Sequence, residues 1–336
     1  MIINDAIKEL VEKKDLTAEV AEQVMESIMS GEASDVAKAA YLTALGMKGE
    51  TIDEITASAI GMRKFSKKLK HSGDVFEIVG TGGDHSNSFN ISTTASIVIA
   101  AAGIKVAKHG NRAASSKCGA ADVLEALGVN IMLEPEKMEN VLEQVGIAFM
   151  HAQIYHQAMK NVGPIRKELG IKTVFNILGP LTSPACAEIQ IMGVYKEELV
   201  EPMARVLAKL GVKKAMVVYG QDGLDEISLS APTTVCEYRN GTFTSYVIEP
   251  DKLGLTMCTK ADIAGGTPEE NAQITRDILN RAKGARTDIV VLNAAAGVYL
   301  ANEGMKLEEA IGIVRELLES GKAAKKLEEF VKATNE

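Results

Sequence analysis

The sequence predicts an α/β protein in which a mainly parallel central sheet, flanked by helices, is joined to a small all-helical domain. Three observations support this prediction. The first seventy residues carry only helical patterns, and the later residues alternate short β-branched runs with helical stretches. In addition, 46% of the 336 residues are hydrophobic, which is enough to fill a large core.

The helical domain is predicted from the signals that begin helices. Small hydroxyl and amide side chains precede four apolar-periodic stretches, and in the last of them Thr51 and Glu54 have the spacing of a capping box. The predicted N-caps are Asn4, Thr17, Ser34 and Thr51. Residues 155–180 also read as helical and end at Gly179 and Pro180, so we expect them to return to the N-terminal helices.

The sheet is predicted from short β-branched runs that are separated by helical patterns. These runs are 75–79, 105–107, 130–133, 147–150, 189–194, 215–219 and 289–292. Residues 233–248 alternate like a hairpin around Asn240 and Gly241, a pair that favours a tight primed turn. The expected domains are therefore 1–70, joined by part of 155–185, and a large domain of 74–154 with 186–336.

Charge and cysteine content exclude several classes of protein. The 37 basic and 45 acidic side chains give a net charge of −8, which argues against a surface devoted to nucleic acid or membrane. The four cysteines have no CxxC spacing, so neither a zinc site nor a disulfide framework is indicated. The N-terminal stretch MIINDAIKELVEKKDL is charged throughout, unlike a signal peptide. We expect a cytoplasmic protein.

The stretch GTGGDHSNSFNIST follows the first predicted strand and has little side-chain bulk. Its glycines leave backbone N–H groups accessible to an anion, and Ser92, Thr93 and Thr94 are predicted to cap the next helix. We therefore predict a phosphorylated ligand. A plain strand-to-helix turn is an equal alternative for this motif alone, because it matches neither GxGxxG nor the P-loop spacing.

A second loop of the same kind follows the next predicted strand, in KHGNRAASSKCGAADVLEALG. It combines the cations Lys108 and Arg112 with the amide of Asn111 and the hydroxyls of Ser115 and Ser116. A solvated charged face is the alternative. Two loops suited to an anion are thus expected at neighbouring strand ends.

Two further features carry charge suited to a ligand. Asp225 and Glu226 follow a predicted strand and are candidate magnesium ligands, although adjacent carboxylates are often only surface residues. Arg166, in VGPIRKELG, is suited to a bidentate hold on a carboxylate, or is an ordinary arginine of a helix surface.

Together, GTGGD, NIST, KHGNRAASS, VGPIRKELG, NILGPLT and GLDEIS, in this order, resemble the anthranilate phosphoribosyltransferase family over almost the full chain. The resemblance implies Mg²⁺-dependent transfer of the phosphoribosyl group from phosphoribosyl pyrophosphate to the amine of anthranilate, in tryptophan biosynthesis. It also implies a homodimer formed through the helices. Whether an anthranilate synthase subunit docks is left open.

The resemblance also assigns residues to the two substrates and the metal ion. The positions that match phosphoribosyl-pyrophosphate binding are Gly80, Gly83, Asp84, Ser88, Asn90, Ile91, Ser92, Thr93, Lys108, Ser115, Ser116 and Ala120. The metal positions are Ser92, Asp225 and Glu226. The anthranilate positions are Gly80, Asn111 and Arg166, with His109 and His156 as neighbours, and a packed histidine is an equal reading of His156. No general base is implied, and Lys108 and Mg²⁺ act electrostatically.

The sequence departs from the family pattern at a few positions. Ala120 stands where a serine is common and Ser88 where threonine is frequent, while His151 and Gln153 replace a usual aromatic and proline near the acceptor route. These departures leave acceptor preference open. Two alternatives also remain, a pyrimidine nucleoside phosphorylase and a non-catalytic relative that binds a phosphate ligand or nucleic acid. KHGNRAASS with VGPIR argues against the first, and the Asp225–Glu226 pair against the second.

Overall fold

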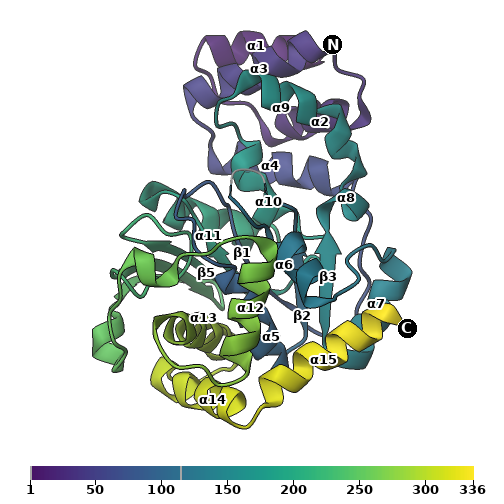
Figure 1. The fold of residues 1–336 in the computed structure, drawn as a ribbon. Coiled ribbons are helices and arrows are strands. Elements are labelled where there is room, and N and C mark those ends of the chain that lie inside the picture. Colours follow the sequence, from purple (N-terminus) through teal and green to yellow (C-terminus); the bar gives the residue numbers. More distant parts are fainter. Residues whose placement is uncertain (1, 114–115) are drawn as a thin grey trace.

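The computed structural model describes residues 2–113 and 116–336, in which a small helical body is stacked on a larger α/β body (Figure 1). The N-terminal helices are α1 (Ile2–Val11), α2 (Ala18–Ser30), α3 (Asp35–Lys48) and α4 (Ile52–Arg63). Three predicted N-caps are confirmed, because Thr17, Ser34 and Thr51 each accept a backbone N–H three residues later. The cap at Asn4 is wrong, because α1 begins at Ile2 and Asn4 lies inside its first turn.

The central helical segment is broken into short pieces rather than one helix. They are α8 (Ala152–Tyr155), a 3₁₀ turn η1 (Gln157–Asn161), α9 (Gly163–Leu169) and α10 (Phe175–Leu181). Asn161 ties this segment to the N-terminal helices, because its side chain donates to Met29 O at 2.7 Å and its carbonyl accepts from Lys38 Nζ at 2.8 Å. The helix α10 ends at Leu181, one residue beyond the predicted stop at Gly179 and Pro180.

Seven strands form one sheet in the order β3-β2-β1-β4-β5-β6-β7. They are β1 (Phe76–Gly80), β2 (Val106–Gly110), β3 (Ile147–His151), β4 (Ile189–Gly193), β5 (Lys214–Gly220), β6 (Thr233–Arg239) and β7 (Thr242–Ile248). The strands β1 to β5 run parallel, and β6 and β7 add an antiparallel hairpin whose turn is Asn240 and Gly241, both with positive φ, as predicted.

Two of the predicted strands are wrong. Residues 289–292 lie inside α13 (Ala285–Ala301), a helix buried on almost every side, whose short apolar runs cannot be told from strand runs by periodicity. Residues 130–133 form the connection between α6 (Ala120–Leu127) and α7 (Pro135–Val145), where Asn130 Oδ1 accepts the Met132 N–H at 3.1 Å and so forms a turn.

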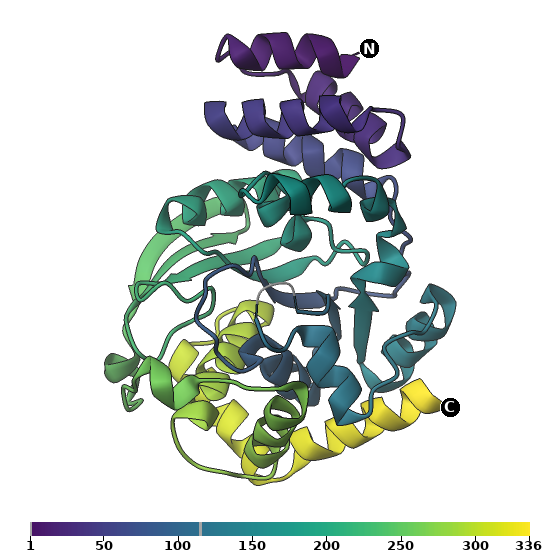
Figure 2. The same cartoon turned by 45° about the horizontal axis from the view of Figure 1, so that its top comes forward.

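Helices cover both faces of the sheet, and each face has its own hydrophobic core. One core packs α5 (Ile91–Ala101) and α13 against side chains such as Phe76 and Ile78. The other joins the small helical body to α11 (Val200–Lys209) and to side chains such as Met192 and Val217 of the opposite face. Figure 2 shows the helices that lie between the N-terminal bundle and the sheet. The remaining helices are α12 (Pro268–Leu279), α14 (Leu307–Glu319) and α15 (Lys322–Asn335).

In the described part of the chain, no helix combines the length and apolar character that crossing a bilayer requires.

Candidate active site

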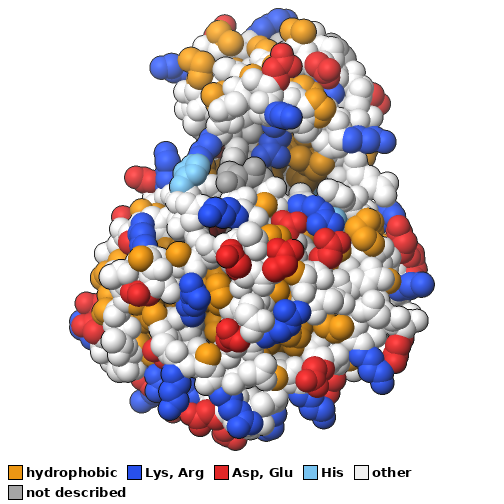
Figure 3. All heavy atoms as spheres, viewed as in Figure 1, with side chains coloured by type: hydrophobic (Ala, Val, Ile, Leu, Met, Phe, Trp, Pro, Cys, Tyr) orange, Lys and Arg blue, Asp and Glu red, His pale blue; other side chains and the backbone are white. Residues whose placement is uncertain are grey.

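The site lies at the carboxyl ends of β1, β2, β4 and β5, where the order of the strands reverses. The chain continues from β1 to β2 on one side of the sheet and later to β4 on the other side, so a crevice is expected beyond these strand ends. The two loops predicted to bind an anion and the Asp225–Glu226 segment all follow strands of this group. Figure 3 shows basic side chains along the waist between the two bodies of the molecule.

Two glycines make room for the carboxylate segment at the strand ends. A Cβ on Gly193 would lie 1.7 Å from Asp225 O, and one on Gly80 would lie 2.3 Å from Asp225 Oδ2, so no larger residue fits at either position. Gly82 has a φ of +68° and donates its N–H to Asp225 Oδ2 at 2.6 Å. The glycine loop therefore contacts the acidic segment directly, and the loop's low bulk is required by packing.

Asp225 and Glu226 are half-buried and lie beside a hydroxyl and a buried lysine. The Ser92 N–H donates to Glu226 Oε1 at 3.2 Å, and the Asp225 N–H donates weakly to Asp84 Oδ2 at 3.5 Å. Burial raises the pKa of Glu226 to about 7, although the positive charge of Lys108 opposes the shift. Burial, and then repulsion from Asp84 and Glu226, raises the pKa of Asp225 well above its usual value. The segment is therefore short of positive charge.

Lys108 is the cation at the centre of this group and is only 3% exposed. Its ammonium donates to Ile78 O at 2.7 Å and to Ser92 Oγ at 3.3 Å, which leaves one of its three N–H groups for a ligand. Burial lowers the pKa of Lys108, and the negative charges of Glu226, Glu77 and Asp225 oppose that shift. Lys108 belongs to β2, whereas the sequence pattern predicted it in the following loop.

Asn90 joins the glycine loop to the second loop. Its amide nitrogen donates to Cys118 O at 3.2 Å, and its oxygen accepts from Asn271 Nδ2 at 2.9 Å. Neither Cys118 nor Asn271 was predicted, because a single cysteine and a helix asparagine carry no motif in the sequence. Within the second loop the backbone packs closely on Gly119, since a Cβ at Gly119 would lie 2.4 Å from the Ala113 nitrogen.

The hydroxyls of NIST do not cap a helix from outside, contrary to the prediction. The helix α5 begins at Ile91 with Asn90 at the N-cap, so Ser92, Thr93 and Thr94 lie within its first turn. Ile91 and Thr93 are buried, which leaves only Ser92 of this group beside the carboxylates. Ordinary capping rules placed the start of the helix about four residues too late because the apolar run was counted only from Ala95.

The remaining residues predicted for phosphoribosyl pyrophosphate surround the two loops. Ser88 forms an isolated bridge with Ala264, and Ser116 Oγ donates to Cys118 O at 3.3 Å. Ala120 is the first residue of α6, as expected. Ser115 lies outside the described residues. A cavity of about 10 Å³ separates the two loops, and residues such as Ser88 and Ser116 line it.

Two histidines predicted for the acceptor side meet below the second loop. The rings of His109 and His156 have centroids 4.9 Å apart and are buried. Burial lowers the pKa of His156 to about 4 and that of His109 well below its usual value, so both rings are neutral near pH 7. Within the described part of the chain, the Nε2 atom of each ring lacks a hydrogen-bond partner. His151 is also buried, whereas Gln153 is exposed.

The other two acceptor residues lie apart. Asn111 is exposed and accepts the Arg112 N–H at 2.8 Å. Arg166 lies on α9, and its guanidinium lies 5.3 Å from the ring centroid of Phe175. No carboxylate among the described residues forms an ion pair with Arg166, and burial lowers its pKa. A half-buried guanidinium without a carboxylate partner is suited to receive one from a ligand.

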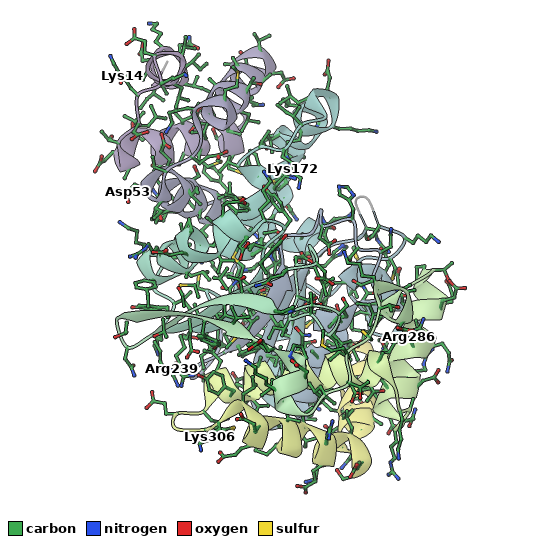
Figure 4. All side chains as sticks on the ribbon, turned by 90° about the vertical axis from the view of Figure 1, so that its left-hand side faces the viewer. Lys14, Asp53, Lys172, Arg239, Arg286 and Lys306 are labelled. Atoms are coloured by element: carbon green, nitrogen blue, oxygen red, sulfur yellow. The ribbon has the colours of Figure 1, made fainter. Side chains whose placement is uncertain are left out.

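Lys172 is a residue of this region that sequence reasoning missed. It follows α9, and its ammonium donates to Gly83 O at 3.3 Å while lying 3.4 Å from the ring centroid of Tyr195. Figure 4 places it between the helical body and the α/β body. A single lysine in a loop gives no sequence signal, so only the fold brings it to the glycine loop.

The donors at this site fit a hard divalent cation. Among the described residues, no group of three or more His, Cys, Asp or Glu side chains is arranged to hold a metal ion. The donors are two carboxylates and the Ser92 hydroxyl, and Mg²⁺ commonly binds to one or two carboxylates together with phosphate oxygens and water. The raised pKa values of Asp225 and Glu226 indicate that neighbouring residues do not fully neutralise the two carboxylates, as expected for ligands of a cation. A groove of about 610 Å³ lies elsewhere, near Arg281 and Arg315, and no predicted site residue lines it.

Comparison with known families matches both bodies of the molecule. Residues 72–324 match the glycosyl transferase family, a/b domain, and residues 4–66 match the glycosyl transferase family, helical bundle domain. The chain is 60% identical to the anthranilate phosphoribosyltransferase of Lachnoclostridium phytofermentans and 56% identical to that of Methanobrevibacter smithii. The alignments cover 99% of this chain in both cases, and 99% and 100% of those proteins.

Solved structures agree with these sequence matches. The anthranilate phosphoribosyltransferase of Thermus thermophilus superposes with a TM-score of 0.94 at 42% identity, covering 99% of this chain and 100% of that one. The Saccharomyces cerevisiae enzyme, in complex with phosphoribosyl pyrophosphate and Mg, superposes with a TM-score of 0.91 at 28% identity, covering 99% and 98%.

Proposed function

The chain belongs to the anthranilate phosphoribosyltransferase family, and from this premise we propose how its residues carry out the reaction. The enzyme transfers the 5-phosphoribosyl group from phosphoribosyl pyrophosphate to the amine of anthranilate, releasing pyrophosphate, in tryptophan biosynthesis. The single observation that carries the proposal is the cluster that the buried Lys108 forms with the half-buried Ser92, Asp225 and Glu226 at the strand ends. A nucleoside phosphorylase activity is not favoured.

The leaving pyrophosphate is the main electrostatic demand of this reaction. As the bond between ribose C1 and the pyrophosphate oxygen breaks, negative charge grows on the leaving group and positive charge on the sugar. The free N–H of Lys108 and the glycine-loop amides would hold that negative charge. Ser92, Asp225 and Glu226 would hold Mg²⁺, which supplies additional charge neutralisation to the diphosphate when it is bound.

The amine nitrogen of anthranilate forms the new bond to C1 and then loses one proton. An aromatic amine is unprotonated near neutral pH, so its lone pair is available without a strong general base. Arg166 would hold the anthranilate carboxylate, and Asn111, His109 and Gly80 would lie beside the ring. The task of these residues is to orient the amine toward C1.

One variant separates the two substrates. Arg166→Ala is expected to raise the KM for anthranilate, because a charge-assisted hydrogen bond is lost. The rise should correspond to a loss of about 1.5 to 3 kcal/mol of binding free energy. The KM for phosphoribosyl pyrophosphate should change much less. Steady-state kinetics with each substrate varied in turn would test this, and equal effects on both substrates would contradict the role of Arg166.

A second variant tests the metal assignment. Asp225→Asn combined with Glu226→Gln should lower turnover and its dependence on Mg²⁺ concentration, while the circular dichroism spectrum stays unchanged. The assay follows the loss of anthranilate fluorescence with phosphoribosyl pyrophosphate, with and without Mg²⁺. Wild-type activity of the double variant at limiting Mg²⁺ would remove the assignment. Thymidine cleavage with phosphate is the control for the phosphorylase alternative.

We further propose that the protein is cytoplasmic and forms a homodimer through its small helical domain, which comprises residues 1–70 and part of 155–185. The exposed apolar side chains Val11, Val36 and Met47 on α1 and α3 support a contact surface there. Light scattering after gel filtration would measure the mass, and a Val36→Glu variant should shift it toward the monomer. A monomeric wild-type protein would contradict the proposal.

A further inference from the structure

The strands β1 and β2 separate next to the site. They share one paired position, Phe76 with Val106, where the Phe76 N–H donates to Lys105 O at 2.8 Å. By contrast, β2 stays paired with β3 from Val106 to Gly110, and β1 stays paired with β4 along its whole length. The sheet therefore opens at the junction that carries Lys108.

Two side-chain hydrogen bonds replace the missing backbone bond. Continuing the parallel register would direct the His109 N–H to the Ile78 carbonyl. Instead, the His109 N–H donates to Glu77 Oε1 at 2.8 Å, and the Ile78 carbonyl accepts from Lys108 Nζ at 2.7 Å. The Glu77 carboxylate thus accepts the N–H group, and the Lys108 ammonium donates to the carbonyl, that would otherwise bond to each other.

Glu77 is costly to bury at this position. It is fully buried, and its second oxygen, Oε2, has no described partner at normal hydrogen-bond geometry, although the Ser183 hydroxyl is close enough to lower the pKa of Glu77. Burial raises its pKa to about 7, even though hydrogen bonding to His109 and the charge of Lys108 act in the opposite direction. Two strands joined by ordinary backbone bonds would avoid this cost, so the gain from Glu77 must lie in the geometry that it imposes.

We propose that Glu77 is a positioning residue for the transfer reaction. By accepting the His109 N–H it keeps β2 apart from β1, which leaves the Ile78 carbonyl free to orient the Lys108 ammonium toward Ser92 Oγ. Without this acceptor, the His109 N–H would bond to Ile78 O and displace the ammonium. The inference rests on the proposed function of the site, in which Lys108 binds the leaving diphosphate.

The test compares variants that keep either the charge or the reach of the side chain. Glu77→Gln keeps an oxygen at the right distance, whereas Glu77→Asp keeps the charge but is too short to span the gap. We expect Glu77→Asp to lower kcat/KM for phosphoribosyl pyrophosphate roughly ten- to hundredfold, and Glu77→Gln to stay within about threefold of wild type. A purely structural role of the charge would give the reverse order.

Glu237→Asp is the matched control. Glu237 is a buried carboxylate of β6 that accepts hydrogen bonds from Tyr246 at 2.8 Å and Tyr299 at 3.0 Å, so the same substitution perturbs the same sheet away from Lys108. It should lower the thermal midpoint without changing kcat/KM. Equal kinetic losses in Glu77→Asp and Glu237→Asp, or a Glu77→Gln loss as large as that of Glu77→Asp, would overturn the proposal.

Two further comparisons make the outcome decisive. If Glu77→Asp does not fold, Glu77→Leu replaces it, because leucine fills the space and removes the acceptor; wild-type kcat/KM in Glu77→Leu would contradict the role. Wild-type protein is measured in the same assay. Absence of transfer by the wild type would overturn the proposed function, whereas an active wild type with an unaffected Glu77→Asp would overturn only this inference.

Discussion

The molecule contains two places where a buried lysine side chain lies beside carboxylates, and they differ in how fully the charges are satisfied. In the small domain, Lys48 Nζ donates to Glu54 Oε2 at 2.8 Å and to Asp15 Oδ1 at 2.6 Å. Glu54 also accepts the backbone N–H groups of Leu16 at 2.9 Å and Thr51 at 2.8 Å. At the strand ends, Lys108 contacts a carbonyl and a hydroxyl, and none of its hydrogen bonds reaches Asp225 or Glu226.

The protonation equilibria follow this difference. Burial alone would lower the pKa of Lys48, but the hydrogen bonds to Asp15 and Glu54 outweigh it and raise that pKa. The pKa of Lys108 is lowered by burial, and its carboxylate neighbours do not compensate. A buried charge that is fully paired stabilises one arrangement of the chain, whereas one that is incompletely paired retains capacity to bind a charged ligand.

The largest expected effect is on catalysis at the incompletely paired grouping. Lys108→Met should lower kcat/KM for phosphoribosyl pyrophosphate by on the order of 10²- to 10³-fold, because a preorganised donor to the leaving group is lost. The free energy of unfolding should change little, since the lysine is poorly compensated in the free protein. Kinetics and urea denaturation of the same preparation measure both quantities. Large destabilisation with unchanged kinetics would reverse the comparison.

The fully paired grouping should respond in the opposite way. Lys48→Met leaves Glu54 buried without its cation and should lower the free energy of unfolding by about 3 kcal/mol. Both KM values and kcat should remain those of the wild type at a temperature where the variant is folded. Urea denaturation gives the first quantity and the fluorescence assay gives the others. A specific kinetic defect would mean that Lys48 also acts on the site.

The third expected effect concerns pH. The folded pKa of Glu77, about 7, lies above its ordinary value of 4.5, so the folded state binds this proton more tightly than the unfolded state. The resulting stability is present below about pH 4.5 and is lost as the pH rises through 7, with a slope approaching 1.4 kcal/mol per pH unit. Glu77→Gln should remove this slope between pH 4.5 and 7 in the metal-free protein. An identical slope in the variant would assign the titration to other groups.

Local chemistry made most of the fold predictable. The caps at Thr17, Ser34 and Thr51 and the hairpin turn at Asn240 and Gly241 depend on neighbours a few residues apart, and the structure has them as predicted. The failures at 130–133 and 289–292 have a different cause. A short apolar run specifies burial but not backbone conformation, and the decision between helix and strand comes from distant packing partners.

The site residues likewise fall into those that a local motif identifies and those that only the fold brings together. Motif residues such as Ser92, Lys108, Asp225 and Glu226 were identified from the sequence, and the fold brings them into one cluster at the strand ends. Lys172, Asn271 and the positioning contact of Glu77 were not, because each depends on a bond between residues that are distant in sequence. Glu77 has no distinguishing feature in the sequence of β1 until its partner, the His109 N–H of β2, is known.

The small domain shares its hydrophobic core with later parts of the chain, so its packing cannot be completed until those parts have been synthesised. Its N-terminal helices pack against Phe175 and Leu178 of α10, so they leave the ribosome well before those partners exist. At ordinary elongation rates the delay is roughly 5 to 20 seconds, far longer than a helix needs to form. During that interval α2 and α4 can pack against each other, but the apolar side chains of α4 that face α10 and α11 stay uncovered until those helices are synthesised.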